Sequence, residues 1–224
     1  MRLLLLFALL IPAFAAAQTA APPPVPAPPA VTARAYVLYD AAAGQIIASQ
    51  NPGERMEPAS LTKLMTAYLT FAALKQGRLK LDQAVPVSPR AWKAEGSRMF
   101  IEPNRPVTVD ELIRGMIVQS GNDACIALAE AIAGSEEVFA QMMTREAARL
   151  GMKNTSFMNS TGLPHPQHYT TANDLTLLVA ALIHDFPEYY PLYSQKEFTY
   201  NKITQSNRNR LLWLDPTVDG VKTG

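Results

Sequence analysis

A serine and a lysine at a spacing of three, Ser60 and Lys63, form a pair that suits nucleophilic catalysis. A helix is expected to begin here, and this spacing places both side chains on one of its faces. A serine hydroxyl is a weak nucleophile until a neighbouring base takes its proton, and lysine becomes such a base when burial or a nearby cation lowers its pKa. The pair equally fits a capping serine followed by a solvated lysine, because S-x-x-K occurs by chance roughly once in a chain of this length.

Two further short motifs follow along the chain. In Ser120-Gly121-Asn122, the serine suits proton relay, and the asparagine amide can both donate to and accept from a substrate amide. In Lys222-Thr223-Gly224, the lysine and hydroxyl suit a carboxylate, and the glycine lets a ligand backbone approach. Alone, each motif equally indicates an ordinary turn or strand end. Together, in the order S-x-x-K, S-x-N and K-T-G, they are the signature set of the active-site serine penicillin-recognising enzymes.

The sequence resembles one branch of these enzymes, the low-molecular-mass penicillin-binding proteins that act as D-alanyl-D-alanine carboxypeptidases. The resemblance runs from about Ala35 to Gly224. The segments that carry it are Glu57–Thr66, Gly96–Phe100, Ser120–Ala124, Asn207–Asn209 and Val218–Gly224. The flanks of the three motifs favour the carboxypeptidase branch over the rest of the superfamily.

The resemblance implies a catalytic role for three residues. Ser60 would attack the peptide carbonyl between the two D-alanines of a peptidoglycan stem peptide. Lys63 would take the serine proton, and Ser120 would pass a proton to the leaving D-alanine. β-Lactams, which mimic the D-Ala-D-Ala terminus, would acylate Ser60. Neither a metal nor another cofactor is implied.

The resemblance also implies which residues bind the substrate. Asn122 would bind the substrate amide, while Lys222 and Thr223 would hold its terminal carboxylate. Lys222 would in addition help keep Lys63 neutral by like-charge repulsion. Arg208 would border the same site in a supporting role.

Local patterns predict the elements that carry these residues. A β-hairpin is expected over 34–40 and 45–49, and a helix after Ser60 that ends at Gly77. Further helices are expected from the capping box at Thr108 to about Ser120, and over 124–133, 136–150 and 171–183, with strands over 198–203 and 218–223. This order predicts an α+β fold. The resemblance specifies a β-lactamase/DD-peptidase-like fold, with an antiparallel sheet flanked by helices and an all-helical subdomain.

The amino terminus has the pattern of an export signal. Arg2, a short apolar run and the small residues of 13–17 predict a signal peptide over 1–17, with cleavage after Ala17 favoured over Ala15. Six of the 18 prolines fall between Gln18 and Ala30, which predicts a Pro-rich linker over 18–32. The catalytic domain is expected over 33–224, in the periplasm or at the outer face of the cytoplasmic membrane.

The family pattern continues beyond K-T-G, with further strands and the second N–H of the oxyanion hole. We therefore expect the catalytic domain to be incomplete at Gly224, and residues 18–224 alone to aggregate or melt without cooperativity. No apolar run is long enough to anchor this chain in a membrane.

The composition of the chain excludes several classes of protein and of binding site. Hydrophobic residues make up 48% and charged residues 17% of the 224, which excludes a mostly disordered chain. A formal net charge of +1 argues against nucleic acid as a partner. The single cysteine, Cys125, excludes an internal disulfide and a thiolate zinc cage, and its apolar helix predicts a small buried side chain.

Three rival functions remain. A serine β-lactamase shares all three motifs, but the E-x-x-L-N segment of class A enzymes does not follow Ser120. A non-catalytic penicillin-binding fragment is the second rival. A zinc hydrolase is the third, and its candidate ligands are His165, His168 and His184. Prolines break the loop around His165 and His168, so we expect both to be surface residues.

Overall fold

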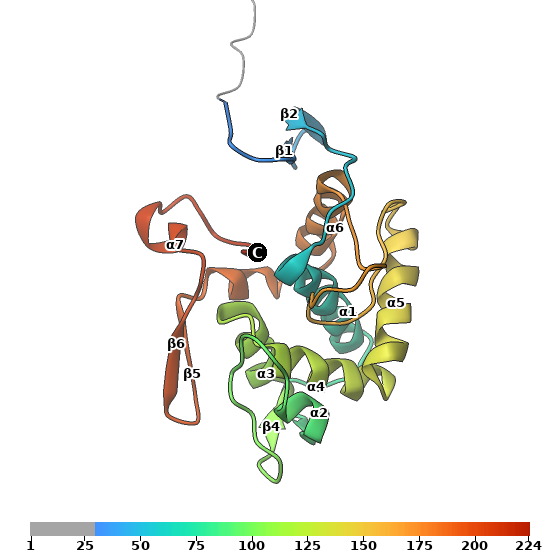
Figure 1. Cartoon of the computed structure of the whole chain (residues 1–224). Coiled ribbons are helices and arrows are strands. Elements are labelled where there is room, and N and C mark those ends of the chain that lie inside the picture. The colour runs from blue at the N-terminus through green and yellow to red at the C-terminus, as the bar shows by residue number, and fades with distance from the viewer. Residues whose placement is uncertain (1–29) are drawn as a thin grey trace, which may run out of the picture. The chain divides into compact units, whose positions relative to one another are not determined.

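Helix α1 (Lys63–Lys75) lies at the centre of the fold and carries ten buried residues among its 13. It follows a short 3₁₀ turn, η1 (Ala59–Thr62), and ends as expected before Gly77, whose φ of +69° suits glycine. A helix that is buried on every side is typical of the core of a domain. The first motif therefore spans the junction of η1 and α1, with Ser60 on the turn and Lys63 as the first residue of the central, buried helix (Figure 1).

The computed structural model describes residues 30–224. The predicted signal peptide, 1–17, and most of the predicted linker, 18–32, lie outside the described residues, and the boundaries of both stay predictions. Residues 33–224 form one compact unit, to which all the elements below belong. Within residues 30–224, no helix combines the length and the apolar character that a membrane span needs.

Four more long helices pack around α1, and their ends match the local patterns of the sequence. They are α3 (Val109–Val118), α4 (Asn122–Ala133), α5 (Glu136–Arg149) and α6 (Ala172–Asp185). The capping box of α3 is present, because Thr108 Oγ1 accepts from the Glu111 N–H and Glu111 Oε2 accepts from the Thr108 N–H. Ser135 and Thr171 cap α5 and α6 through their side-chain oxygens, which accept from the backbone N–H groups of Val138 and Asp174. Helix α4 contacts α1, α3 and α5, and so forms a second buried layer.

The strands of the described residues form three separate two-stranded antiparallel sheets. The expected hairpin is present as β1 (Tyr36–Asp40) and β2 (Gln45–Gln50), with a register irregularity between Leu38 and Tyr39. A short ribbon of β3 (Ala84–Val85) and β4 (Val107–Thr108) was not expected, because two-residue strands leave no periodic pattern. The third sheet pairs β5 (Glu197–Tyr200) with β6 (Ile203–Ser206). Helices with small antiparallel sheets confirm the α+β class.

Two strand predictions are wrong. Residues 198–203 do not form one strand, because the chain reverses at Asn201 and Lys202, which have φ of +48° and +64°. Residues 218–223 do not form a strand in this structure, although they are rich in β-branched side chains. A strand requires a neighbour for its ladder, and here the backbone is held by side chains instead: Asn209 Nδ2 donates to the Gly220 carbonyl at 3.0 Å.

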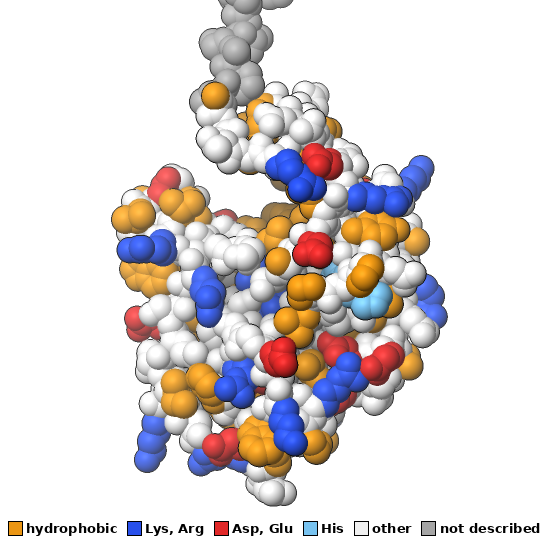
Figure 2. Space-filling model, in the orientation of Figure 1, with side chains coloured by type: hydrophobic (Ala, Val, Ile, Leu, Met, Phe, Trp, Pro, Cys, Tyr) orange, Lys and Arg blue, Asp and Glu red, His pale blue; other side chains and the backbone are white. Residues whose placement is uncertain are grey.

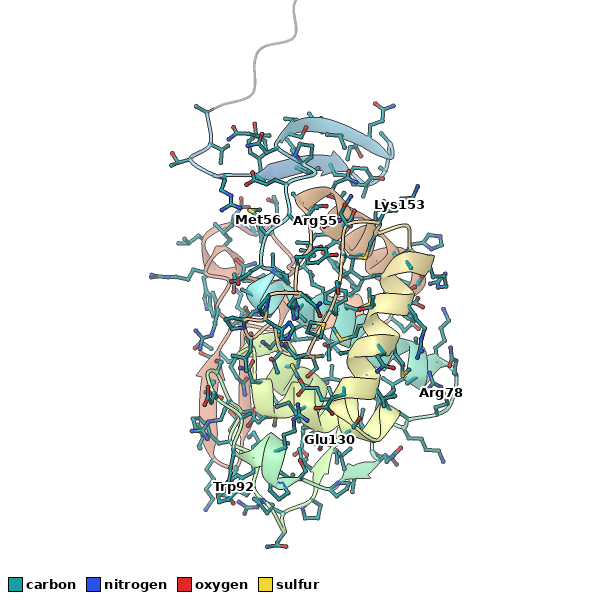
Figure 3. All side chains as sticks on the ribbon, turned by 45° about the vertical axis from the view of Figure 1, so that its right-hand side comes forward. Arg55, Met56, Arg78, Trp92, Glu130 and Lys153 are labelled. Carbon is teal, nitrogen blue, oxygen red and sulfur yellow. The ribbon has the colours of Figure 1, made fainter. Side chains whose placement is uncertain are left out.

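Three short helical segments complete the fold: α2 (Pro89–Trp92), η2 (Tyr190–Ser194) and α7 (Leu211–Leu214). Figure 3 shows Trp92 and Glu130 at the end of this unit that lies away from the β1–β2 hairpin, while Arg55 and Met56 lie next to the hairpin. The link that leaves the hairpin is fixed by an isolated bridge between Met56 and Thr170. This bridge determines where the chain enters the turn that carries Ser60.

Candidate active site

Ser60 and Lys63 are in contact, as the spacing predicted. The Lys63 Nζ lies 3.2 Å from the Ser60 Oγ, and the lysine is only 2% exposed. Burial lowers the pKa of Lys63, and the charge of Arg208 lowers it further. The neighbouring Cys125 thiol acts in the opposite direction only when ionised, and burial raises its pKa to about 12. Burial and the charge of Arg208 thus both shift this amine toward its uncharged form, the form that can accept a proton from the serine hydroxyl.

A backbone segment that carries no motif, residues 159–163, supports this pair. The Thr161 carbonyl accepts from Lys63 Nζ at 2.6 Å, and the Ser160 carbonyl accepts from Thr66 Oγ1 at 2.7 Å. Gly162 has a φ of +91°, and a Cβ there would clash with the Ala59 carbonyl. Sequence analysis missed this segment, because a backbone carbonyl has no residue signature, and Gly162 was the only available signal.

The second motif lies where α3 passes into α4. Ser120 adopts a φ of +67°, and its buried Oγ has no hydrogen-bond partner among residues 30–224. The Asn122 Nδ2 donates to the Glu95 carbonyl at 2.7 Å, and a Cβ on Gly96 would lie 2.9 Å from the same nitrogen. Glycine at position 96 is what allows the amide to approach. A strained backbone and an unpartnered hydroxyl are typical of functional sites.

Asp123, the next residue, anchors the loop that borders this motif. Its carboxylate accepts the backbone N–H groups of Met99, Phe100 and Ile101 at 3.0, 2.8 and 3.2 Å. Burial raises the pKa of Asp123, and these backbone hydrogen bonds oppose the shift. Asp123 belonged to a segment that carried the family resemblance, but sequence analysis gave it no role.

Arg208 joins the loop to the end of α3. Its Nη2 donates to Ser97 Oγ at 2.7 Å, and its Nε donates to the Gln119 carbonyl at 3.3 Å. Ser97 Oγ itself donates to that carbonyl at 2.8 Å. The guanidinium therefore fixes the backbone just before Ser120 and keeps a positive charge near Lys63.

The third motif approaches Lys63 from the carboxyl end of the chain. Burial lowers the pKa of Lys222 to about 8, with a further contribution from the charge of Lys63. The Lys222 Nζ donates to the Thr223 carbonyl at 2.8 Å. Three basic side chains, Lys63, Lys222 and Arg208, thus lie close enough that the charge of one lowers the pKa of another, with Lys222 and Arg208 as the cations beside a lysine shifted toward its neutral form. Such a cluster suits an anionic ligand.

The histidines do not form a metal site. His165 and His184 are exposed, but His168 is buried at 2% exposure, so the surface location expected for it is wrong. Its Nε2 lies 2.8 Å from Thr62 Oγ1, and burial lowers its pKa to about 4. The loop that carries His168 therefore packs against the η1 turn, and the pattern of prolines did not indicate this contact. No group of three metal-ligating side chains lies within residues 30–224. Cys125 is buried, as expected.

Comparison with known proteins identifies the family. A family model for S11 peptidases, described as D-alanyl-D-alanine carboxypeptidase, matches residues 18–224. The chain belongs to this family. It is 48% identical over 219 residues to the D-alanyl-D-alanine carboxypeptidase DacC of Escherichia coli K12, which covers 95% of this chain and 53% of that protein. DacA of Haemophilus influenzae is 46% identical over 202 residues, covering 88% and 51%.

Solved structures agree with this assignment. Penicillin-binding protein 5 of Haemophilus influenzae superimposes with a TM-score of 0.86 at 45% identity, over 89% of this chain and 59% of that one. Penicillin-binding protein D2 of Listeria monocytogenes, in its ampicillin-bound form, gives 0.78 at 29% identity, over 89% and 81%. These likenesses confirm the predicted family resemblance and fold. The chain spans about half the length of the curated relatives it matches.

Proposed function

We propose that this protein is a serine-type D-Ala-D-Ala carboxypeptidase, which removes the terminal D-alanine from peptidoglycan stem pentapeptides through an acyl-enzyme on Ser60. The observation that carries the proposal is the 3.2 Å contact between Ser60 Oγ and the buried Nζ of Lys63. Its relatives bear the name of this activity, which supports the same reaction. The roles of the individual residues below are part of the proposal.

Acylation begins with Lys63 as the base. A neutral amine has two N–H bonds and one lone pair, so an N–H donated to the Thr161 carbonyl leaves the lone pair available for the Ser60 proton. The Ser60 Oγ attacks the carbonyl carbon of the D-Ala-D-Ala bond, and the tetrahedral intermediate collapses as that C–N bond breaks. Ser120 passes its proton to the departing amine and takes in its place the proton that Lys63 accepted from Ser60, so Lys63 is neutral again for the next step. This relay accounts for the unpartnered hydroxyl of Ser120.

Deacylation uses the same base. Lys63 takes a proton from a water molecule, which attacks the ester carbonyl of acylated Ser60. The ester C–O bond breaks, Ser60 regains its proton, and the shortened peptide leaves. The enzyme therefore needs no cofactor. A β-lactam would acylate Ser60 by opening its ring, and the ampicillin-bound structure of a neighbour supports this use of the site.

The cationic cluster supplies substrate recognition. Lys222 and Thr223 hold the terminal carboxylate, and Asn122 hydrogen-bonds the substrate amide. Arg208 contributes positive charge beside the site, and two of its five N–H donors bind Ser97 Oγ and the Gln119 carbonyl. The export pattern of residues 1–17 supports a location outside the cytoplasm, where peptidoglycan is found.

The test is D-alanine release from an N-acylated peptide ending in D-Ala-D-Ala, with the L-Ala-L-Ala peptide and Ser60→Ala as controls. We expect release from the D-peptide alone and none from the variant. Hydrolysis of benzylpenicillin without D-alanine release would instead identify a β-lactamase. Covalent penicillin labelling without turnover of either compound would identify a non-catalytic binding protein.

A further inference from the structure

Glu136 is a buried carboxylate that belongs to none of the three motifs. It is the first residue of α5 and only 4% exposed. Its Oε2 accepts from Arg90 Nη2 at 2.7 Å, and its Oε1 accepts from both the backbone N–H and the Oγ of Ser160, at 2.9 and 2.7 Å. A buried charge is costly unless it is paired and hydrogen-bonded, and the positive end of the α5 dipole adds to its partners.

The Ser160 contact leads directly to the catalytic lysine. Ser160 is held at its N–H and Oγ by Glu136 and at its carbonyl by Thr66 Oγ1. The next carbonyl in the chain, Thr161 O, accepts from Lys63 Nζ at 2.6 Å. One peptide unit thus separates the carboxylate's anchor from the atom that orients the amine. Because peptide units are planar and stiff, fixing Ser160 restricts where the Thr161 carbonyl can point.

We propose that Glu136 is a positioning residue for the reaction, which acts through Ser160 and the Thr161 carbonyl to aim the lone pair of Lys63 at Ser60. This inference rests on the proposed function. Glu136 exchanges no proton with the substrate and does not touch Lys63. Without it, two donors of Ser160 lose their acceptor, the 159–163 segment loosens, and water reaches the amine.

Glu136 also has a purely structural interpretation, because its link to Arg90 joins α2 to α5. The two interpretations differ in the pH dependence of acylation. Acylation requires a neutral Lys63, so its rate rises as pH passes through the pKa of that amine. The other groups that act on this charge, Arg208, Lys222 and Cys125, lie on other elements and are unchanged in the variants below. A structural role alone would reduce the amount of folded enzyme, but the pH at which the acylation rate rises, the acid limb of the pH–rate profile, would stay unchanged.

Glu137→Ala provides a matched control, since Glu137 also pairs with Arg90 but is exposed and does not contact Ser160. The measurement is the acylation rate of the full-length protein by a fluorescent penicillin, per titrated active site, from pH 5 to 10. We expect Glu136→Ala to lower the rate by about 10- to 100-fold and to move the acid limb to higher pH. Glu136→Gln retains an acceptor for Ser160 and should stay within about threefold of wild type.

The inference would be overturned if the Glu136→Ala enzyme showed the wild-type acylation rate per active site and an acid limb at the wild-type pH. Should that variant fail to fold, Ser160→Ala decides instead, because it removes only the Oγ donor. Ser160→Ala should lower the acylation rate several-fold and move the acid limb to higher pH. An unchanged pH–rate profile would refute the proposal. If neither the wild type nor Glu137→Ala is labelled, the proposed function fails, rather than this inference.

Discussion

The two sides of the candidate site are supported by different kinds of structure. Ser60, Lys63, Ser120 and Asn122 lie on helices or helix junctions whose neighbouring side chains are almost fully buried. Lys222, by contrast, lies on a segment without regular secondary structure, which the Asn209 amide and a hydrogen bond from Tyr190 to Asp219 hold in place. The core thus preorganises the proposed nucleophile, whereas a few side-chain contacts maintain the side proposed to bind the substrate carboxylate.

The same contrast appears in the apolar surface. Core residues of α1 and α4 such as Met65 and Leu128 are 0% exposed. On the Lys222 side, by contrast, Ile47 is 64% and Leu214 75% exposed. A groove of about 940 Å³ lies there, and it is lined by β1, α6 and residues 217–222. Figure 2 shows this hollow beneath the hairpin, and apolar side chains gathered over α7. Changes that disturb the buried packing of the helical side should therefore affect stability and activity together, and changes on the Lys222 side should affect mainly substrate binding.

The largest expected effect is that of Ser60→Ala, which removes the proposed nucleophile. Covalent labelling by a fluorescent penicillin should vanish, while the free energy of unfolding should change by less than about 1 kcal/mol, because Ser60 is only half-buried. Gel fluorescence and chemical denaturation measure the two quantities. Persistent labelling at the wild-type level would show that another serine is acylated.

Gly162→Ala should be the most destabilising of these changes on the helical side. The new Cβ would clash with the Ala59 backbone, and the positive φ is unfavourable for alanine. We expect a loss of about 3 kcal/mol or more in the free energy of unfolding, together with loss of labelling. Gly53→Ala is the control, because its Cβ would meet no atom within 4 Å. Equal melting temperatures for the two variants would contradict the supporting role of residues 159–163.

A pH titration should sharpen the comparison on the Lys222 side. The pKa of Lys222 is lowered to about 8, so its charge is present below that pH and lost above it. The KM for a D-Ala-D-Ala peptide should therefore rise about tenfold between pH 7 and pH 9, following the fraction of charged lysine. Lys222→Met should show a high KM that does not change across this range. A pH-independent KM in the wild type would argue against carboxylate binding by Lys222.

The smallest effect expected is that of Asn209→Ala, which removes the hydrogen bond to the Gly220 carbonyl. The cost in stability should be about 1 kcal/mol, whereas KM should rise several-fold because Lys222 is held less firmly. Steady-state kinetics measure the change in KM, and thermal melting measures the change in stability. Asn173→Ala, at an exposed position on α6, should change neither. A fall in kcat alone would mean that Asn209 acts on the nucleophile instead.

Sequence analysis succeeded where the determining interactions are local. The capping box at Thr108 and the contact of Ser60 with Lys63 each involve residues within four positions, so their spacing alone predicted them. It failed where pairing is long-range. Whether residues 218–223 form a strand depends on a neighbour elsewhere in the chain, and β-branched side chains do not reveal one.

The candidate site shows the same limit. The Thr161 carbonyl that binds Lys63 is 98 residues away in sequence, and Ser160 is 24 residues from Glu136. His168 was expected on the surface because prolines surround it, yet its loop packs against Thr62, 106 residues away. Motifs identify side chains that react, but the groups that position them are often backbone atoms brought close only by the fold.

The anchoring of the loop by Asp123 has a consequence for how this site can diverge. The carboxylate binds the backbone N–H groups of residues 99–101, and every amino acid except proline supplies such a group. Of these three residues, Met99 and Ile101 are buried in the core at 0% and 1% exposure, and only Phe100 presents its side chain to solvent, at 40%. A substitution of Phe100 by any residue that keeps the backbone N–H can therefore change the surface of this border while the hydrogen bonds to Asp123 are retained.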